Sequence, residues 1–174
     1  MDEDLRGLLT PRVERLGYLG EFFQLAAHQP AALSGFVRFT EALKGALPWR
    51  LVETVALTVA AQTGNEYELV QHEILAARLG MSGREISALV AASVTAPPFA
   101  PEEVTAAGLA RKVVSATGHG CDGLVAQLED EIGTATAVGC LLLCGRYLAH
   151  AAISNAWRLP PPPVVRPVSE EVDV

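Results

Sequence analysis

Aromatic residues are scarce, no cluster of Lys and Arg occurs, and no uncharged segment is long enough to cross a membrane. Aromatic residues make up 6% of the 174 residues, while 50% are hydrophobic, with an excess of alanine, leucine and valine. These proportions are typical of packed helices. The length suits one domain with its own core. We expect a single all-α domain over residues 1–159, followed by a proline-rich acidic tail over residues 160–174.

The charge balance argues against two classes of partner. The net charge is −7, so a nucleic-acid backbone or an anionic membrane surface would find little to bind. The start, Met1-Asp2-Glu3-Asp4, lacks the basic and apolar regions of a signal peptide. The uncharged run over residues 132–145 is shorter than the roughly 20 residues of a membrane helix. We expect it to be a buried helix segment.

Cysteine is rare, and its three copies have no paired spacing. An odd number of cysteines argues against a secreted disulfide framework and favours a reducing cytoplasm. Cys140 and Cys144 are spaced i, i+4, and we expect both to be small buried side chains. Cys121 lies within a predicted glycine-rich loop.

Helix signals recur with few strand signals between them. The apolar spacing predicts helices over about 31–46, 48–63 and 66–79. Gly80 is expected to end the third, and Ser82 with Glu85 to form a capping box for a fourth. A further helix is expected from Pro101 to about Gly118. A loop marked by Gly118, Gly120 and Gly123, a short helix, and a long helix over about 134–157 complete the prediction.

One stretch without basic residues, between Arg50 and Arg78, holds several glutamates and a single histidine. Asn65, Glu68 and His72 are separated by three and four residues, so they share one helix face. The same face continues into Leu75 and Leu79, which predicts that the polar groups point towards the core.

The preceding apolar helix contains one interior charge, Glu53, which must be paired or protonated there. The short connection between the two helices predicts that Glu53 approaches His72. Carboxylates would raise the pKa of this imidazole and burial would lower it, so the ring suits acid/base catalysis. A satisfied polar patch or a subunit contact is the alternative interpretation.

A metal site of Glu53, Glu68 and His72 is a further alternative. No second histidine supports it, because His28, His119 and His150 lie on other segments. We therefore expect no metal and no cofactor.

Three stretches together resemble the core motif of carboxymuconolactone decarboxylases and alkylhydroperoxidase D-like proteins. They are residues 47–53 (LPWRLVE), residues 65–73 (NEYELVQHE), and Gly80-Met81-Ser82 with Glu85-Ile86. The resemblance implies an alkylhydroperoxidase D-like helical bundle that assembles into a homo-oligomer, a trimer or a hexamer. It also implies an active site near the subunit contacts.

The peroxidase branch of this superfamily carries a Cys-x-x-Cys pair before the histidine, which relays protons with an upstream glutamate. The relay positions match His72 and Glu53, but the two cysteine positions hold Asn65 and Glu68. Neither residue can form a sulfenate or a disulfide, so this redox chemistry cannot run at the site.

The decarboxylase branch implies that His72 donates or accepts a proton, while Glu53 and Glu68 orient it or carry a second proton. Tyr67 and Asn65 are the expected substrate-binding residues. The implied function is a cofactor-independent acid/base lyase or isomerase acting on a small organic acid or lactone. A hydroperoxidase and a non-catalytic helical oligomer are the alternatives. No cation for a carboxylate substrate is evident nearby, although Arg50, Arg78 or Arg146 could reach the site from elsewhere.

Overall fold

A computed structural model describes residues 3–161, and within that range it contains helices and no strands. The all-α prediction is therefore confirmed. The helices are α1 (Glu3–Leu16), α2 (Glu21–Ala26), α3 (Pro30–Ala46), α4 (Trp49–Thr63), α5 (Glu66–Leu79), α6 (Gly83–Val90), α7 (Pro101–Ala116), α8 (Asp122–Ile132) and α9 (Thr134–Ala156). Most of the predicted tail, from residue 162 onward, lies outside the described residues.

Several helix ends follow local signals in the sequence. Pro30 occupies the first turn of α3, where its missing N–H costs nothing. Gly64 and Gly80 end α4 and α5 in the left-handed region, with φ of 61° and 107°. Ser82 and Glu85 form the predicted capping box at the start of α6.

Two local predictions are wrong. Gly123 lies inside α8 and not in the loop that Gly118 and Gly120 occupy. Residues 132–145 do not form one helix segment, because Gly133 separates α8 from α9 with φ 80° and ψ 154°. An isolated glycine gives no signal by which sequence alone distinguishes a break from a tolerated helical position. The patterns also predict neither α1 nor α2.

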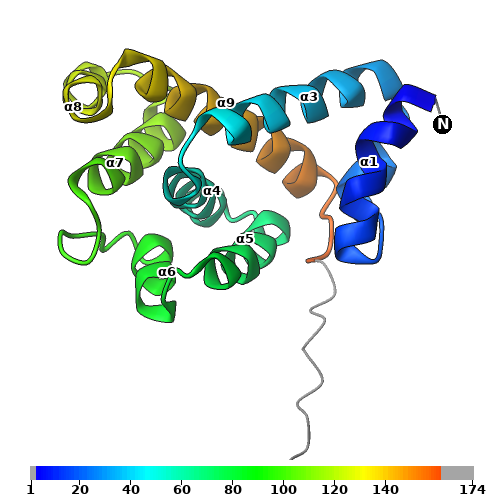
Figure 1. Cartoon of the computed structure of the whole chain (residues 1–174), viewed down its shortest axis with the longest axis horizontal. Coiled ribbons are helices and arrows are strands. Elements are labelled where there is room, and N and C mark those ends of the chain that lie inside the picture. Colours follow the sequence, from blue (N-terminus) through cyan, green and yellow to red (C-terminus); the bar gives the residue numbers. More distant parts are fainter. Residues whose placement is uncertain (1–2, 162–174) are drawn as a thin grey trace, which may run out of the picture.

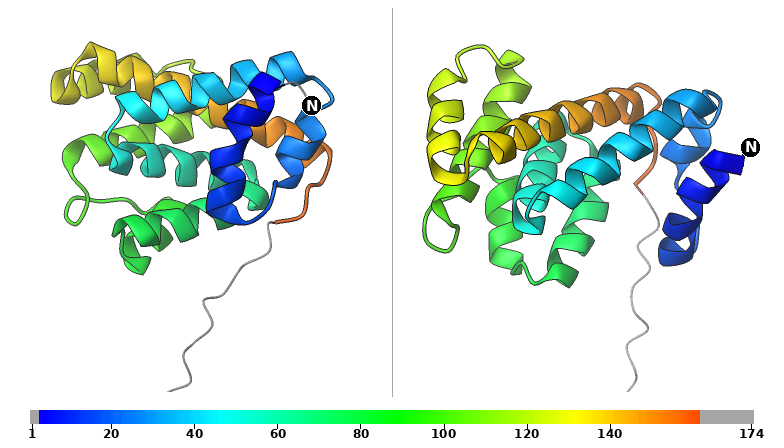
Figure 2. Two further views of the ribbon diagram at one scale, coloured as in Figure 1. Left: turned by 45° about the vertical axis from the view of Figure 1, so that its right-hand side comes forward. Right: turned by 45° about the horizontal axis from the view of Figure 1, so that its top comes forward.

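Helix α4 lies at the centre of the domain, where Figure 1 views it along its axis. It packs against α5, α6, α7 and α9, and every residue from Leu51 to Ala60 is buried. Glu53 is therefore held inside the protein with no route to water of its own. Helices α3 and α9 pack side by side along one edge of the domain (Figure 2).

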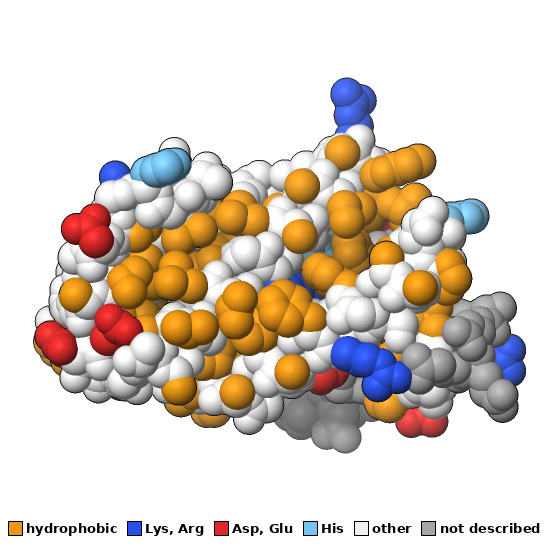
Figure 3. Space-filling view, turned by 90° about the horizontal axis from the view of Figure 1, so that it is seen from above, with side chains coloured by type: hydrophobic (Ala, Val, Ile, Leu, Met, Phe, Trp, Pro, Cys, Tyr) orange, Lys and Arg blue, Asp and Glu red, His pale blue; other side chains and the backbone are white. Residues whose placement is uncertain are grey.

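Within the described residues, α9 is the one helix long and apolar enough to cross a membrane by length and composition. Core helices of water-soluble proteins meet the same criteria, and half of the apolar window of α9 is buried in the domain. Its other side faces outward beside α3, where hydrophobic side chains gather across the middle of the face seen from above (Figure 3).

Candidate acid/base site

His72 lies between two carboxylates. Its Nδ1 atom is 2.7 Å from Oε2 of Glu53 on α4, and its Nε2 atom is 2.9 Å from Oε2 of Glu68, one turn earlier on α5. The expected approach of Glu53 to His72 is found, because α4 and α5 pack against each other directly after the Gly64-Asn65 connection. Both ring nitrogens therefore have an acidic partner.

The second oxygen of Glu68 joins this group to α9. Oε1 accepts a hydrogen bond from Nε2 of His150 at 2.8 Å and from Nη1 of Arg146 at 3.3 Å. Of the three arginines that could reach the site, Arg146 does so, and the expectation that no second histidine supports the cluster is corrected by His150. Glu68 bridges the two imidazole rings.

The cluster is almost closed to solvent in the single chain. The side chains of His72, Glu53 and Glu68 are 6%, 3% and 7% exposed. Burial by itself would lower the pKa of His72, but attraction and hydrogen bonding to Glu53 and Glu68 raise it above the ordinary value of 6.5. Its carboxylate neighbours therefore favour the imidazolium form of His72.

The two histidines that contact Glu68 have pKa values shifted in opposite directions, upward for His72 and downward for His150. Burial would raise the pKa of Glu68, but the His150 ring and the Arg146 guanidinium hold that pKa well below its usual value. Burial lowers the pKa of His150, and the nearby cations Arg146 and His72 lower it further. Glu68 raises this pKa, but the lowering effects prevail. His150 is therefore neutral, donates from Nε2 to Glu68, and accepts at Nδ1 from the Ser154 hydroxyl at 3.0 Å.

Charge is balanced inside this cluster. With Glu53 and Glu68 ionised, the Arg146 guanidinium and the His72 imidazolium supply two compensating positive charges. A buried ion is tolerated when it is both paired and hydrogen-bonded. Loss of one proton from His72 would leave one negative charge in excess, which is the physical reason for the raised pKa.

Aromatic rings enclose the same atoms. The Tyr147 hydroxyl lies 3.1 Å from Nε2 of His72, and the two rings meet edge to face with their centres 5.2 Å apart. The Arg146 guanidinium lies over the Tyr147 and Phe36 rings, 4.3 and 5.0 Å from their centres, and its Nε donates to Thr40 at 3.1 Å. Arg146 is thereby fixed in position and shielded from water.

Two predicted substrate-binding residues have local structural contacts. Asn65 caps α5, and its side-chain oxygen accepts from the backbone N–H of Glu68 at 3.3 Å. Tyr67 packs in an apolar cluster with residues of α1, α2 and α3, and burial raises its pKa. Its hydroxyl has no hydrogen-bond partner of good geometry among the described residues, although the Phe22 N–H comes close. Their substrate-binding role stays a prediction.

The face shared by Asn65, Glu68 and His72 does not stay buried along its full length. Leu75 is partly exposed and Leu79 is 43% exposed. The polar half of the face therefore points further into the core than its leucine half, against the expectation.

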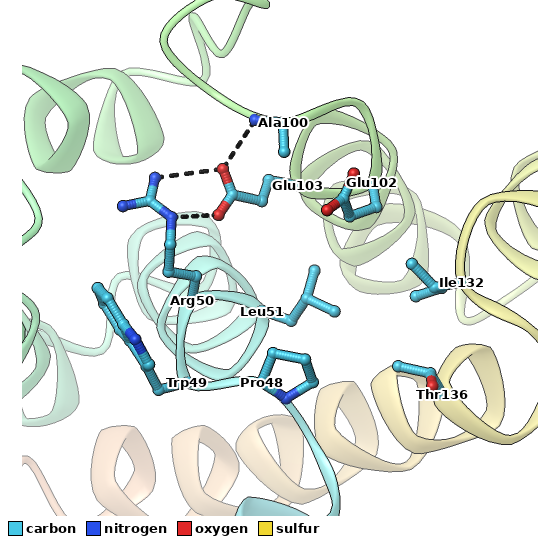
Figure 4. Close-up of a pocket in the computed structure, with 9 residues that line it drawn as sticks. All are labelled: Pro48, Trp49, Arg50, Leu51, Ala100, Glu102, Glu103, Ile132 and Thr136. Carbon is cyan, nitrogen blue, oxygen red and sulfur yellow. Dashed lines mark hydrogen bonds and ion pairs between the residues drawn. The ribbon is translucent and has the colours of Figure 1, made fainter.

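A pocket of about 490 Å³ opens at the start of α4, away from His72. It is lined by Pro48, Trp49, Arg50, Leu51, Ala100, Glu102, Glu103, Ile132 and Thr136 (Figure 4). Its guanidinium, on Arg50, is already bound by Glu103 and by Glu85, the latter at 2.7 Å. No imidazole or thiol lines this pocket, so it offers less acid/base chemistry than the His72 cluster.

Neither a metal site nor a reactive thiol is found in the part of the chain that the structure describes. No group of three or more His, Cys, Asp and Glu side chains there is arranged to hold a metal ion. The three cysteines are free and buried. Burial raises the pKa of Cys140 to about 11 and that of Cys144 to about 12, so both thiols stay protonated.

Sequence reasoning named Arg146 of α9 only as one of three arginines that could reach the site, and it missed Tyr147 and His150. Arg146, Tyr147 and His150 lie at i, i+1 and i+4 within a helix that is otherwise apolar, and this was the available signal. Their charged and polar side chains in such a helix required partners. The sequence could not identify those partners, because Glu68 and Arg146 are 78 positions apart.

The described residues form an all-helical protein with a buried cluster of histidine and carboxylate side chains. Residues 30–112 match the sequence model of the carboxymuconolactone decarboxylase family. No curated protein and no solved structure matches the chain. The matched segment contains Glu53, Glu68 and His72 but neither the N-terminal helices nor α8 and α9.

Proposed function

We propose that this protein is a cofactor-independent acid/base enzyme, a lyase or isomerase that acts on a small organic acid or lactone. The observation that carries the proposal is the placement of His72 between Glu53 and Glu68, at 2.7 and 2.9 Å, with its pKa raised. A general acid must hold a proton in the resting state and release it to a nearby carbon or oxygen. The match of residues 30–112 to the family model supports the same class of chemistry.

In the proposed decarboxylation, the bond between the substrate and its carboxyl carbon breaks and carbon dioxide leaves. The electron pair of that bond stays on the substrate as an enolate-like carbanion. His72 then transfers its Nε2 proton to that carbon, and the electron pair forms the new C–H bond. Glu53 and Glu68 stabilise the imidazolium beforehand and guide its reprotonation from solvent afterwards.

Arg146 supplies the cation that an anionic substrate requires. Its guanidinium is buried, fixed by Thr40 and two aromatic rings, and bound to Glu68 through a comparatively long contact of 3.3 Å. In a site with little water, such a charge stabilises a developing enolate more strongly than it would in bulk solvent. Because the cluster is nearly sealed, substrate access requires local opening of the surrounding helices.

A hydroperoxidase function is less compatible with these residues. Asn65 and Glu68 stand where the peroxidase branch carries its cysteines, and the thiols of Cys140 and Cys144 are buried and held protonated. A thiolate is the attacking species in thiol-dependent peroxide reduction. Replacing Cys121, Cys140 and Cys144 together by serine or alanine should leave activity towards the proposed substrates in place.

A non-catalytic helical scaffold is the second candidate, and near-complete burial of the cluster favours it. Buried polar networks whose members are all paired can serve the fold alone. The scaffold hypothesis predicts that the protein turns over no substrate at all. A substitution of His72 would then change only the stability of the fold.

The test is a screen of small lactones and carboxylic acids that have a carbonyl or double bond next to the reacting carbon. Carbon dioxide release and incorporation of solvent deuterium into the product report the two reaction types. Glu53→Gln and His72→Gln should each lower kcat by roughly 10²–10⁴-fold, the usual contribution of a general acid or base. His119→Gln, at an exposed histidine, is the matched control and should keep wild-type kcat.

Unchanged turnover in both site variants would eliminate the mechanism. Peroxide consumption that vanishes in the variant without cysteines would instead support the hydroperoxidase. If no compound in the screen is turned over and His72→Gln changes only the unfolding midpoint, the result supports the scaffold hypothesis over the enzyme.

A further inference from the structure

Two imidazole rings share one carboxylate in the core of the protein. Oε2 of Glu68 lies 2.9 Å from Nε2 of His72, and Oε1 of the same carboxylate lies 2.8 Å from Nε2 of His150. Each ring thus has an oxygen of its own, and both contacts form at the same time. The proposed decarboxylation uses the proton of His72 and leaves the second imidazole without a role.

Aromatic rings hold His150 in one orientation. Phe22 of α2 stacks on its ring with the centres 3.7 Å apart, and Tyr67 of α5 and Phe36 of α3 lie around it at 5.7 and 6.4 Å. The side chain is almost completely buried. Because the ring is stacked and both of its nitrogens are hydrogen-bonded, His150 stays beside Glu68.

The charges that act on His150 come from α5 and α9. Glu68 attracts the protonated ring, whereas the cations Arg146 and His72 repel it. Two further carboxylates act on other members of the group: Glu53 of α4 on His72, and Glu21 of α2 on Tyr67. An arginine stays charged at every pH that the fold survives. The charge of His72 is therefore the variable that decides whether His150 binds a proton.

The buried charges balance when one imidazole is protonated. The carboxylates Glu53 and Glu68 face one permanent cation, Arg146. One added proton makes the sum zero, and a second would leave an uncompensated positive charge, which is costly inside a protein. The raised pKa of His72 and the lowered pKa of His150 agree with this count. The cluster at rest thus binds one proton, on His72.

Transfer of that proton to a substrate changes the balance at His150. One of the two cations that repel its protonated form disappears, while Glu68 continues to attract it. The cluster is then one positive charge short. A proton bound by His150 at this stage restores the balance without a movement of any helix.

The second nitrogen of His150 is suited to bind this proton. Nδ1 lies 3.0 Å from the Ser154 hydroxyl, which donates to the neutral ring. A hydroxyl also accepts, so Ser154 stabilises the protonated ring when its own hydrogen turns to a backbone carbonyl one turn earlier. Ser154 lies in the last turn of α9, where residues 152, 153, 155 and 156 are exposed. Solvent is therefore close on the Nδ1 side of His150.

We propose that His150 is the second proton-binding residue of this site, and that it takes a proton from solvent at Nδ1 when His72 has delivered its own to the substrate. His150 returns the proton to solvent when His72 is protonated again, so each residue ends the cycle with the hydrogens it had at the start. The catalytic part of this proposal rests on the proposed acid/base function. The exchange of charge between the two rings does not.

The first experiment locates the protons and needs no substrate. NMR of nitrogen-labelled histidine rings in the wild type should show, at neutral pH, a charged His72 and a neutral His150 with its hydrogen on Nε2. In His72→Gln the pKa of His150 should rise by roughly one pH unit or more, because a nearby cation has been removed. The pKa should stay below that of wild-type His72, because His150 has one carboxylate partner and His72 has two.

Tyr147→Phe is the matched control for that titration. It removes an uncharged group that lies 3.1 Å from Nε2 of His72, and the pKa of His150 should keep its wild-type value. A rise as large as in His72→Gln would attribute the change to altered packing and overturn the proposal. An unchanged pKa of His150 in His72→Gln would also overturn it, as would two charged rings in the wild type at neutral pH. The wild-type spectrum stays decisive if His72→Gln does not fold.

The second experiment tests the catalytic part with a substrate from the screen. His150→Gln keeps an amide donor for Glu68 but binds no proton. We expect kcat to fall by roughly tenfold or more, with KM little changed and with His72 still charged in the NMR spectrum. A purely structural role of His150 would instead alter the charge of His72 or leave kcat unchanged.

The two experiments separate this proposal from the proposed function. Wild-type kcat in His150→Gln, together with a large loss in His72→Gln, would remove His150 from the mechanism and leave the acid/base enzyme in place. If His72→Gln also keeps wild-type kcat, the proposed function fails with the catalytic part of this inference. The NMR titration then still decides whether the two rings exchange one proton.

Discussion

Two clusters among the described residues each combine an arginine with two carboxylates, and their surroundings give them different properties. Arg146 and Glu68 lie in the core with His72, at 4% and 7% exposure. Arg50 binds Glu85 and Glu103 beside the pocket at the start of α4, and its side chain is 31% exposed. Water and salt screen the Arg50 guanidinium, although its partner Glu103 is only 4% exposed, whereas every charged side chain of the Arg146 cluster lies in a medium of low dielectric.

The second difference is the group that can change its charge. The Arg50 cluster holds a guanidinium that stays charged, and hydrogen bonds from Ser82 and Arg50 lower the pKa of Glu85 to about 2. The charges of Arg50 and Glu85 are thus constant near neutral pH. The buried cluster contains two imidazoles with opposite pKa shifts. The ion pairs of Arg50 therefore hold helix ends together, whereas those of the Arg146 cluster surround an imidazole that can change its charge.

The largest contrast is expected from one substitution made in both clusters. Arg146→Met leaves Glu68 with one cation fewer in the core, and we expect a loss of about 3–5 kcal/mol in the free energy of unfolding. Arg50→Met removes a partly exposed ion pair and should cost about 1 kcal/mol. Urea denaturation of both variants measures the difference. Equal losses in the free energy of unfolding would show that burial does not make the Arg146 cluster more important for stability than the Arg50 cluster.

The next contrast concerns pH. Because the folded-state pKa of His72 is raised, its stabilising contribution is complete below the ordinary value of 6.5 and is lost as pH rises through the raised value. The loss should reach about 1.4 kcal/mol for each unit by which the pKa is raised. Unfolding free energies measured from pH 6 upward should fall in the wild type and stay flatter in His72→Gln.

His119→Gln is the control for that pH series and should retain the wild-type slope, because His119 is exposed. A His72→Gln profile parallel to the wild type would show that this imidazole does not hold the proton. At acid pH the Glu68 contribution is lost instead, as pH falls through its lowered folded-state pKa.

The smallest effect is expected at the hydroxyl groups of two buried tyrosines. Tyr147→Phe removes a hydrogen-bonding partner of His72 and should cost about 1 kcal/mol in stability. Tyr67→Phe removes a buried hydroxyl that lacks a partner of good geometry, and should cost nothing or stabilise. Thermal unfolding compares the two. A larger loss for Tyr67→Phe would show that its hydroxyl is the better bonded of the two.

The local part of this architecture could be predicted from the sequence. Pro30, Gly64, Gly80 and the Ser82 capping box mark helix ends because each acts through its own backbone or through residues within one turn. The approach of Glu53 to His72 was predictable for a related reason. A connection of two residues leaves consecutive helices few ways to pack.

The rest depended on contacts between distant segments. Gly133 ends α8 and separates it from α9, whereas Gly123 lies within α8. The local sequence does not specify which of the two glycines interrupts the helix. The same limit applies to Leu79, which continues the His72 face but lies at the surface.

By itself, the sequence determined an all-helical chain, most of its helix ends, and a histidine placed among acids on two consecutive helices. Only the tertiary structure decided that Arg146, Tyr147 and His150 complete this group, that it is nearly sealed, and that one side of α9 stays uncovered. Periodicity describes which side of a helix is apolar, because that depends on neighbours along the chain. Partners 78 positions apart meet through packing of the whole domain, which no local pattern encodes.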